Sequence, residues 1–278
     1  MYIFTKIADL QQFLSSQLGS IGFVPTMGAL HIGHLSLIEK SKSETNLTVC
    51  SIFVNPTQFN DKKDFDKYPN TIEADIEKLA SVDTDVLFLP SVDEMYPNGT
   101  EKIKQYEIGY LDTVLDGKFR PGHFNGVCVV VHKLLDAVKP THLFMGEKDF
   151  QQCLVVKRLL EIIKSDIQLI TCPTRREPNG LAMSSRNERL SKGGREKASA
   201  IHYVLKSIKS EQTKSNFADL ESRFVQYLDS NSFETEYILL ADANTLELLL
   251  DFDPAKKMVV LIASKLEGVR LIDNLRIN

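Results

Sequence analysis

The sequence predicts an α/β protein: a parallel sheet covered by helices, followed by a smaller α+β domain. Short apolar runs alternate with segments of helical period through about the first 175 residues. This alternation is typical of β-α-β units, and continuously apolar strands indicate a sheet buried on both faces. After Pro173 two helical segments precede a cluster of strands. We therefore expect one domain at residues 1–174 and another at 175–278.

The first domain should contain a series of apolar strands, at residues 21–25, 47–54, 85–89, 141–145 and 167–172. Amphipathic helices are expected from about His34 and around residues 72–79. The clearest helix covers about residues 125–137 and ends before Pro140, which cannot continue it. In the second domain, helices are expected over 191–209 and 217–228. Strands should follow at 237–241, 258–263 and 269–272.

Composition limits the classes of function. The formal net charge of −4 argues against broad binding to nucleic acid, which needs a basic surface. No apolar run approaches the roughly 20 residues that cross a bilayer, and residues 1–18 lack the apolar core of a secretion signal. We expect a cytoplasmic protein that binds neither nucleic acid nor membrane.

The cysteines are widely spaced, at positions 50, 128, 153 and 172. They form no C-x-x-C pair, so a zinc knuckle or a redox motif is not indicated. Free, buried thiols are expected.

The segment P-T-M-G-A-L-H-I-G-H, at residues 25–34, follows the first predicted strand and opens the first helix. Open α/β sheets bind ligands at such positions. Gly28 allows backbone to approach a ligand closely, and a helix N-terminus attracts an anion. His31 and His34 can both point at that anion. An isolated H-x-x-H pair is more often incidental or part of a metal site, but no motif here supplies a third metal ligand.

No G-x-x-x-x-G-K-[ST] loop occurs, and no G-x-G-x-x-G follows a strand. ATP, if bound, must therefore use the histidine-bearing turn. Strand, turn, H-x-G-H and helix in this order resemble the nucleotide signature of the adenylyltransferase superfamily, which implies a Rossmann-like domain.

The chain also resembles the pantoate-beta-alanine ligase family in ordered blocks along its whole length. These blocks are P-T-M-G-A-L-H-I-G-H at 25–34, S-I-F-V-N-P-T-Q-F at 51–59, Y-P-x-T at 68–71, Y-P-N-G-T at 96–100, R-P-G-H-F-x-G-V at 120–127, G-E-K-D-F-Q-Q at 146–152, G-L-A-M-S-S-R-N at 180–187 and R-L-I-D-N at 270–274. The resemblance implies that ATP converts pantoate to pantoyl adenylate, which beta-alanine then attacks to give pantothenate and AMP. It also implies a homodimer.

The residue types suit this chemistry. Negative charge builds up on the α-phosphate and the departing pyrophosphate during adenylation. Catalysis therefore depends mainly on hydrogen-bond donors held close to these groups. The expected catalytic residues are His34, His31, Lys148, Ser184, Ser185 and Arg186, with His34 favoured as proton donor to the leaving side. The expected ATP-binding residues are Met27, Gly28, Ala29, Leu30, His31, Ile32, Gly33, His34, Gly146, Glu147, Lys148, Asp149, Arg175, Met183, Ser184, Ser185 and Arg186.

Pantoate carries a carboxylate and hydroxyl groups, and side-chain amides can donate to the first and accept from the second. The resemblance assigns Gln58 and Gln152 to pantoate, and Gln58 also to the beta-alanine side. Asn55, which follows a strand, is a further candidate for substrate binding. The loop at 183–186 looks like a mobile phosphate loop, and we expect its domain to close over ATP.

Magnesium is expected because triphosphate chemistry requires charge neutralisation, and phosphate oxygens and water should hold most of its coordination sphere. The sequence predicts no protein metal site, and Asp75 is expected to face outward from its helix. Where many relatives carry Asp-Gly, this chain has Asn179-Gly180, which should make the same turn.

Two other classes of function stay open. A nucleotidyltransferase of the same fold would transfer AMP to a phosphate, and a regulatory nucleotide-binding module would catalyse nothing. A regulator has little need of His34, Lys148, Ser185 and Arg186 together, whereas a ligase needs all of them.

Overall fold

The computed structural model describes residues 1–58, 69, 71–101 and 103–278. The predicted blocks at 51–59 and 68–71 therefore include Phe59, Tyr68 and Asn70, which lie outside the described residues. The chain divides into two compact units. The first comprises Met1–Glu147 and Gln151–Pro173, and the second comprises Lys148–Phe150 and Thr174–Asn278.

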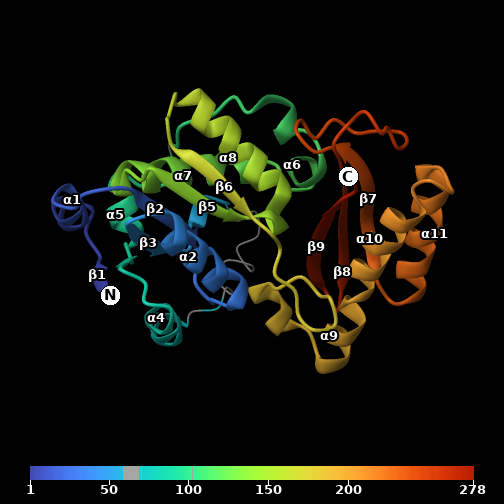
Figure 1. Cartoon of the computed structure of the whole chain (residues 1–278), viewed down its shortest axis with the longest axis horizontal. Coiled ribbons are helices and arrows are strands. Elements are labelled where there is room, and N and C mark those ends of the chain that lie inside the picture. Colours follow the sequence, from blue (N-terminus) through green and yellow to red (C-terminus); the bar gives the residue numbers. More distant parts are fainter. Residues whose placement is uncertain (59–68, 70, 102) are drawn as a thin grey trace. The chain divides into compact units, whose positions relative to one another are not determined.

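The first unit is built on a parallel sheet of six strands in the order β1-β4-β3-β2-β5-β6 (Figure 1). The strands are β1 (Tyr2–Phe4), β2 (Ile21–Thr26), β3 (Leu47–Ile52), β4 (Val86–Phe88), β5 (His142–Gly146) and β6 (Gln168–Cys172). From β2 the chain continues to β3 and β4 on one side of the sheet, whereas β5 and β6 lie on the other side of β2. The carboxyl ends of β2 and β5 therefore flank the topological switch point, where open α/β sheets bind their ligands.

Helices cover both faces of this sheet (Figure 1). The helices of this part of the chain are α1 (Ile7–Ser15), α2 (Ile32–Glu44), α4 (Ile72–Ser81), α5 (Val92–Met95), α6 (Leu115–Phe119), α7 (His123–Val138) and α8 (Phe150–Ile162). One apolar cluster joins β-strand side chains such as Phe23 to α1, α7 and α8, and another joins Val24 and its neighbours to α2 and α4. Successive strand residues thus enter opposite cores, which explains why the strands read as continuously apolar.

The second unit contains α9 (Lys192–Ala198), α10 (Ala200–Glu211), α11 (Phe217–Ser230) and an antiparallel sheet in the order β7-β8-β9. Its strands are β7 (Glu234–Asp242), β8 (Met258–Leu266) and β9 (Val269–Arg276), and α10 and α11 pack on this sheet (Figure 1). Their buried faces form a separate core that includes Ile201, Leu205, Leu228 and Ile262.

One predicted helix is divided. The continuous helix expected over 191–209 is interrupted at Ser199, which separates α9 from α10. There the Ser199 amide donates to the Glu196 carbonyl three residues back, at 3.4 Å, in place of the helical bond to the carbonyl four residues back. The prediction of a single helix was therefore wrong at this residue.

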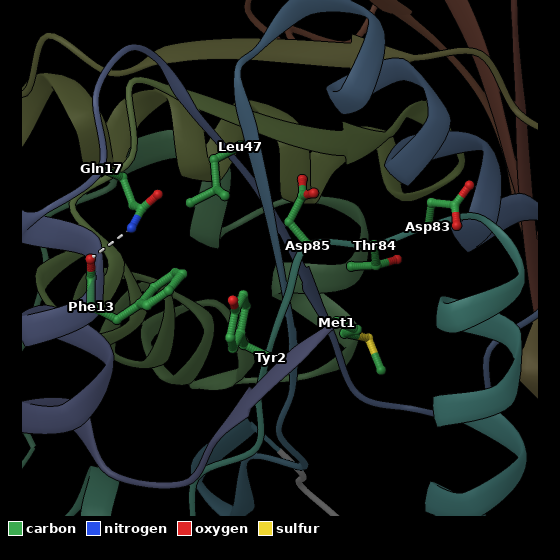
Figure 2. A pocket seen from close by; sticks show the side chains of 8 residues that line it. All are labelled: Met1, Tyr2, Phe13, Gln17, Leu47, Asp83, Thr84 and Asp85. Carbon is green, nitrogen blue, oxygen red and sulfur yellow. Dashed lines mark hydrogen bonds between the residues drawn. The ribbon is translucent and has the colours of Figure 1, made fainter.

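A pocket of about 390 Å³ lies beside β1, at the amino ends of the strands. Figure 2 shows its lining residues, which are Met1, Tyr2, Phe13, Gln17, Leu47, Asp83, Thr84 and Asp85. The Gln17 amide donates to the Phe13 carbonyl at 3.3 Å. This is the edge of the sheet opposite the carboxyl ends, so the pocket is separate from the predicted nucleotide site.

Among the described residues, no helix has the length and apolar character needed to cross a membrane. The four cysteines are free and buried, as predicted. Burial raises the pKa of the Cys50 and Cys128 thiols to about 12, so neither is a reactive thiolate at neutral pH.

Candidate active site

The turn from β2 to α2 has left-handed backbone at two successive residues, Gly28 (φ +81°) and Ala29 (φ +49°). Glycine adopts this conformation freely, whereas for alanine it costs energy and requires support from the surroundings. Thr26 provides part of that support: its hydroxyl donates to the Ser51 carbonyl at 2.7 Å and accepts the Gly28 amide at 3.3 Å. The turn is therefore tied to the neighbouring strand β3.

Asp75 of α4 supplies the remaining support. Its carboxylate accepts the backbone amides of Ala29 at 2.8 Å and Leu30 at 2.7 Å, and also the Thr71 hydroxyl at 3.1 Å. Asp75 is fully buried, so the predicted outward-facing carboxylate was wrong. The helical period placed Asp75 beside other polar residues, but amides from a distant turn provide the hydrogen bonds that make its burial possible. The Ala29 and Leu30 amides consequently point at Asp75 here.

His31 and His34 lie together at the start of α2. Their ring centroids are 4.0 Å apart, and the His31 backbone amide donates to Nδ1 of His34 at 3.3 Å. A backbone N–H can only donate, so Nδ1 of His34 is the acceptor. In the neutral ring the proton is then on Nε2, which makes Nε2 the atom able to donate to a ligand.

A second cluster follows β3, where the 3-10 turn η1 (Pro56–Gln58) ends in Gln58. Asn55 is 1% exposed, and its Nδ2 donates to Oε1 of Gln58 at 3.2 Å. Nε2 of Gln58 in turn lies 2.9 Å from the sulfur of Met27, the residue that follows β2. The structure thus brings Gln58 and Asn55 from one predicted motif beside Met27 from another.

Two adjacent glutamines of α8 have different surroundings. Gln151 is buried; its Oε1 accepts the Asp116 amide at 3.0 Å, and its Nε2 donates to the carbonyls of Leu111 and Val114 at 2.7 and 2.9 Å. Gln152 is only partly buried. Gln151 therefore holds the 111–116 segment in place, and Gln152 is the member of the pair that can face a ligand.

The G-E-K-D motif begins where β5 ends, at Gly146. Glu147 continues the first unit, whereas Lys148 and Asp149 belong to the second. The Lys148 ammonium is 3.7 Å from the Asp149 carboxylate, and the Lys148 carbonyl accepts from Nδ2 of Asn274 at 2.9 Å. The hydrogen bond to Asn274 holds the Lys148 backbone, and the Lys148 side chain is 17% exposed.

The predicted phosphate loop belongs to the second unit. The Met183 amide donates to the Arg175 carbonyl at 2.9 Å, and the Ser184 hydroxyl accepts the Arg186 amide at 3.3 Å. Ser185 begins the 3-10 turn η4 (Ser185–Arg189) and is buried. Met183, Ser184 and Arg186 are partly buried, and Arg175 is exposed. The predicted phosphate-binding residues 183–186 therefore lie in one short, folded segment.

Asn179-Gly180 makes the turn expected before this loop. Oδ1 of Asn179 accepts the Leu181 amide at 3.1 Å, and Gly180 has a φ of +96°. Arg176 closes the segment from within the second unit, because its guanidinium binds both carboxylate oxygens of Asp273, at 2.6 and 3.0 Å. A carboxylate at position 179 is therefore not required for the turn itself.

Sequence reasoning missed two residues that hold the site. One is Asp75, and the other is Tyr96, whose hydroxyl donates to Oδ1 of Asn55 at 2.7 Å. Tyr96 lies in the Y-P-N-G-T block, so its position was marked by the motif. No local pattern indicated its partner, which is 41 residues away.

Comparison with known proteins finds relatives along nearly the whole chain. Residues 2–276 match the family model described as Pantoate-beta-alanine ligase. The pantothenate synthetase of Cytophaga hutchinsonii is 43% identical over 281 residues, which are 99% of each chain. That of Bacteroides fragilis is also 43% identical, over 282 residues and 99% of each chain.

Solved structures give the same result. Pantothenate synthetase from Thermus thermophilus is 36% identical, with a TM-score of 0.92 over 100% of this chain and 99% of that one. Pantoate-beta-alanine ligase from Francisella tularensis, complexed with beta-gamma ATP and beta-alanine, is 39% identical, with a TM-score of 0.84 over 100% and 98% of the chains. The predicted fold class is confirmed by these neighbours and by the two sheets. The chain belongs to the pantoate-beta-alanine ligase family, whose members are carbon-nitrogen ligases.

Proposed function

We propose that this chain joins pantoate to beta-alanine at the expense of ATP. The observation that carries the proposal lies within the first unit: a histidine-bearing helix start follows β2, and a paired amide cluster that reaches Met27 follows the adjacent strand β3. Donors for a phosphate and amides for a hydroxy acid thus meet at the carboxyl edge of one sheet. A nucleotidyltransferase would need the first group but not the second.

The reaction proceeds in two steps. A carboxylate oxygen of pantoate attacks the α-phosphorus of ATP, the Pα–O bond to the β-phosphate breaks, and pyrophosphate departs. The beta-alanine nitrogen then attacks the acyl carbon, the bond from that carbon to the phosphate oxygen breaks, and AMP departs while the nitrogen loses a proton. Adenylation is needed because an unactivated carboxylate offers no adequate leaving group.

His34 and His31 serve the first step. Nε2 of His34 donates to the oxygens that gain charge as pyrophosphate leaves, and the adjacent His31 ring adds a second donor. Lys148 supplies a cation, and Asp149 serves the ribose hydroxyls. The remaining nucleotide contacts come from residues 27–34, Gly146 and Glu147 as backbone or packing contacts, and from Arg175, Met183, Ser184, Ser185 and Arg186 as phosphate ligands.

Gln58 and Gln152 hold pantoate, because amide groups can donate to its carboxylate and accept from its hydroxyls. Gln58 also serves the beta-alanine side. Asn55 belongs to the same site, and its near-complete burial favours an indirect role. The domain at 175–278 acts as a lid in this proposal, so changing Ser185 or Arg186 to alanine should slow adenylation more than amine transfer.

The charge of the triphosphate would be neutralised by magnesium bound together with ATP. Phosphate oxygens and water would supply most of its ligands. Asp75 fits the role of a metal ligand poorly because its oxygens accept two backbone amides. A homodimeric assembly and a cytoplasmic location complete the proposal.

A pyrophosphate-release assay with the purified protein tests the function. The ligase should release pyrophosphate only when pantoate is present, and should form AMP and pantothenate only after beta-alanine is added. Release that depends on a phosphorylated acceptor would indicate a nucleotidyltransferase. If no substrate combination releases pyrophosphate, the protein is a nucleotide-binding module and the proposal is wrong.

A further inference from the structure

The hydroxyl of Tyr96 makes a short hydrogen bond to a buried amide of the candidate site. Tyr96 follows helix α5 and is 4% exposed, and its hydroxyl donates to Oδ1 of Asn55 at 2.7 Å. The ring is held independently: it packs near Phe53, and the Lys133 ammonium lies 5.0 Å from its centroid. Removing the hydroxyl should therefore leave the ring in place.

Backbone groups show which way the Asn55 amide is turned. Its Nδ2 lies 3.2 Å from the Gly126 carbonyl, which can only accept, and its Oδ1 lies 3.4 Å from the Thr57 amide, which can only donate. A flipped amide would place an acceptor against an acceptor and a donor against a donor. Oδ1 must therefore face Tyr96 and Thr57, and Nδ2 must face the other way. The Thr57 hydroxyl also donates to Oδ1, at 3.1 Å, so the Tyr96 hydroxyl makes the shorter of two side-chain hydrogen bonds to this oxygen.

This orientation determines which end of Gln58 faces outward. Since Nδ2 of Asn55 can only donate, Gln58 must present Oε1 to it, at 3.2 Å. The NH₂ group of Gln58 is then directed to the Met27 sulfur at 2.9 Å, and a thioether is a weak acceptor. The His123 ring fixes the Gln58 backbone through a 2.8 Å hydrogen bond with its carbonyl. An oxygen of a hydroxy acid would readily replace sulfur as the acceptor.

We propose that Tyr96 is a positioning residue for the acid substrate: its hydroxyl locks Asn55, and Asn55 holds the Gln58 amide with its NH₂ group toward the acid. The inference rests on the proposed function, in which Gln58 binds pantoate. It assigns to Asn55 the orienting of another side chain in place of direct substrate contact. Burial raises the pKa of the Tyr96 hydroxyl, so it keeps its proton and its donor role across the working pH range.

Tyr96→Phe tests the inference, with KM for pantoate measured by pyrophosphate release. The loss of one hydrogen bond that orients the amide should raise this KM about threefold to tenfold, with KM for ATP unchanged. Tyr106→Phe is the matched control. Tyr106 is also a buried tyrosine of the first unit, but its hydroxyl bonds to His132. That variant should lower the unfolding midpoint without a change in KM for pantoate.

A double-mutant cycle with Gln58→Ala separates positioning from general destabilisation. Gln58→Ala should raise KM for pantoate strongly, and adding Tyr96→Phe to it should raise KM no further, because the group that Tyr96 orients is gone. An equal further rise in the double variant would overturn the inference. So would a Tyr96→Phe enzyme within about twofold of wild type while Gln58→Ala is impaired. If Gln58→Ala itself leaves KM unchanged, the assignment of Gln58 to pantoate is wrong as well.

Discussion

Oδ1 of Asp75 accepts the backbone amide of Leu30 at 2.7 Å, which ties helix α4 to the turn that carries His31. The same helix also holds the carbonyl of Leu30, since the Lys78 ammonium donates to that oxygen at 2.7 Å. With Ala29 in left-handed backbone, the turn depends on these contacts for its shape. The position of the histidine pair therefore depends on a helix that begins 41 residues after His31.

Asp75→Asn should impair both stability and adenylation. An amide offers one oxygen to the two N–H groups of Ala29 and Leu30, so one buried donor loses its partner at a cost of about 1–3 kcal/mol. Displacement of His31 and His34 should lower kcat about tenfold or more, because reacting groups tolerate little misplacement. Denaturant unfolding and pyrophosphate release measure the two effects.

Asp85→Asn is the control for that change. Asp85 Oδ2 accepts the Thr48 amide at 2.8 Å, a bond that an amide oxygen can replace. Its kcat should match that of the wild type. Equal kcat values for Asp75→Asn and the wild type would show that the turn keeps its shape without the carboxylate.

Gly126→Ala should disturb the amide cluster from the α7 side. A Cβ at this position would lie 2.4 Å from the Thr57 carbonyl oxygen and 2.8 Å from Cα of Gln58, so backbone has to move. We expect a loss of about 1–3 kcal/mol in the free energy of unfolding and a higher KM for pantoate. Gly193→Ala adds the same methyl group to helix α9, where the nearest heavy atom is 4.0 Å away, and should be neutral or stabilising. A Gly126→Ala enzyme with wild-type KM would contradict the prediction.

Asp273→Asn should destabilise the second unit. Asp273 is 3% exposed and pairs with both terminal nitrogens of Arg176, so the substitution leaves a largely buried guanidinium without its counter-charge. The expected cost is about 3–5 kcal/mol, measured by urea unfolding. Glu161→Gln breaks the exposed pair with Arg158 and should leave the midpoint nearly unchanged. Similar midpoints for the two variants would rule out a structural role for the buried pair.

His202 should make the protein less stable in mild acid. Burial lowers its pKa from the ordinary value of 6.5, and the nearby Arg176 and Lys206 charges lower it further while Asp273 opposes them. The unfolded chain then takes up a proton below about pH 6.5 that the folded protein resists, so stability falls as the pH drops toward the lowered pKa. In His202→Gln, the urea midpoint should fall less between pH 7.5 and pH 5 than in the wild type. Parallel pH profiles would contradict this explanation.

Much of the fold could be predicted because the sheet is buried on both faces. All five strands predicted from apolar runs in the first domain are present, since each alternate residue enters one of two cores. β1 was missed because its apolar run, Tyr2–Phe4, is only three residues long. Helix α8 was missed because its first turn lies within the motif G-E-K-D-F-Q-Q, whose polar residues indicate a binding site and not a helix.

The site was predictable where one motif holds the relevant residues and less so where distant segments meet. His31 and His34 are three residues apart, so the start of a helix brings their rings together. The role of Asp75 depends on backbone amides of a turn more than 40 residues earlier, and helical period cannot report such a partner. For the same reason the sequence marks Tyr96 and Asn55 separately without showing that they are joined.

The pocket beside β1 places Met1 at the edge of the sheet opposite the candidate active site. Met1 is 42% exposed and lies at the amino ends of the strands, while Met27 and Asn55 follow the carboxyl ends. A six-residue strand such as β2 spans roughly 20 Å, so the two edges are well separated. An affinity tag, a fluorophore or a solid support attached at the amino terminus is thereby directed away from the histidine turn and its neighbouring amides.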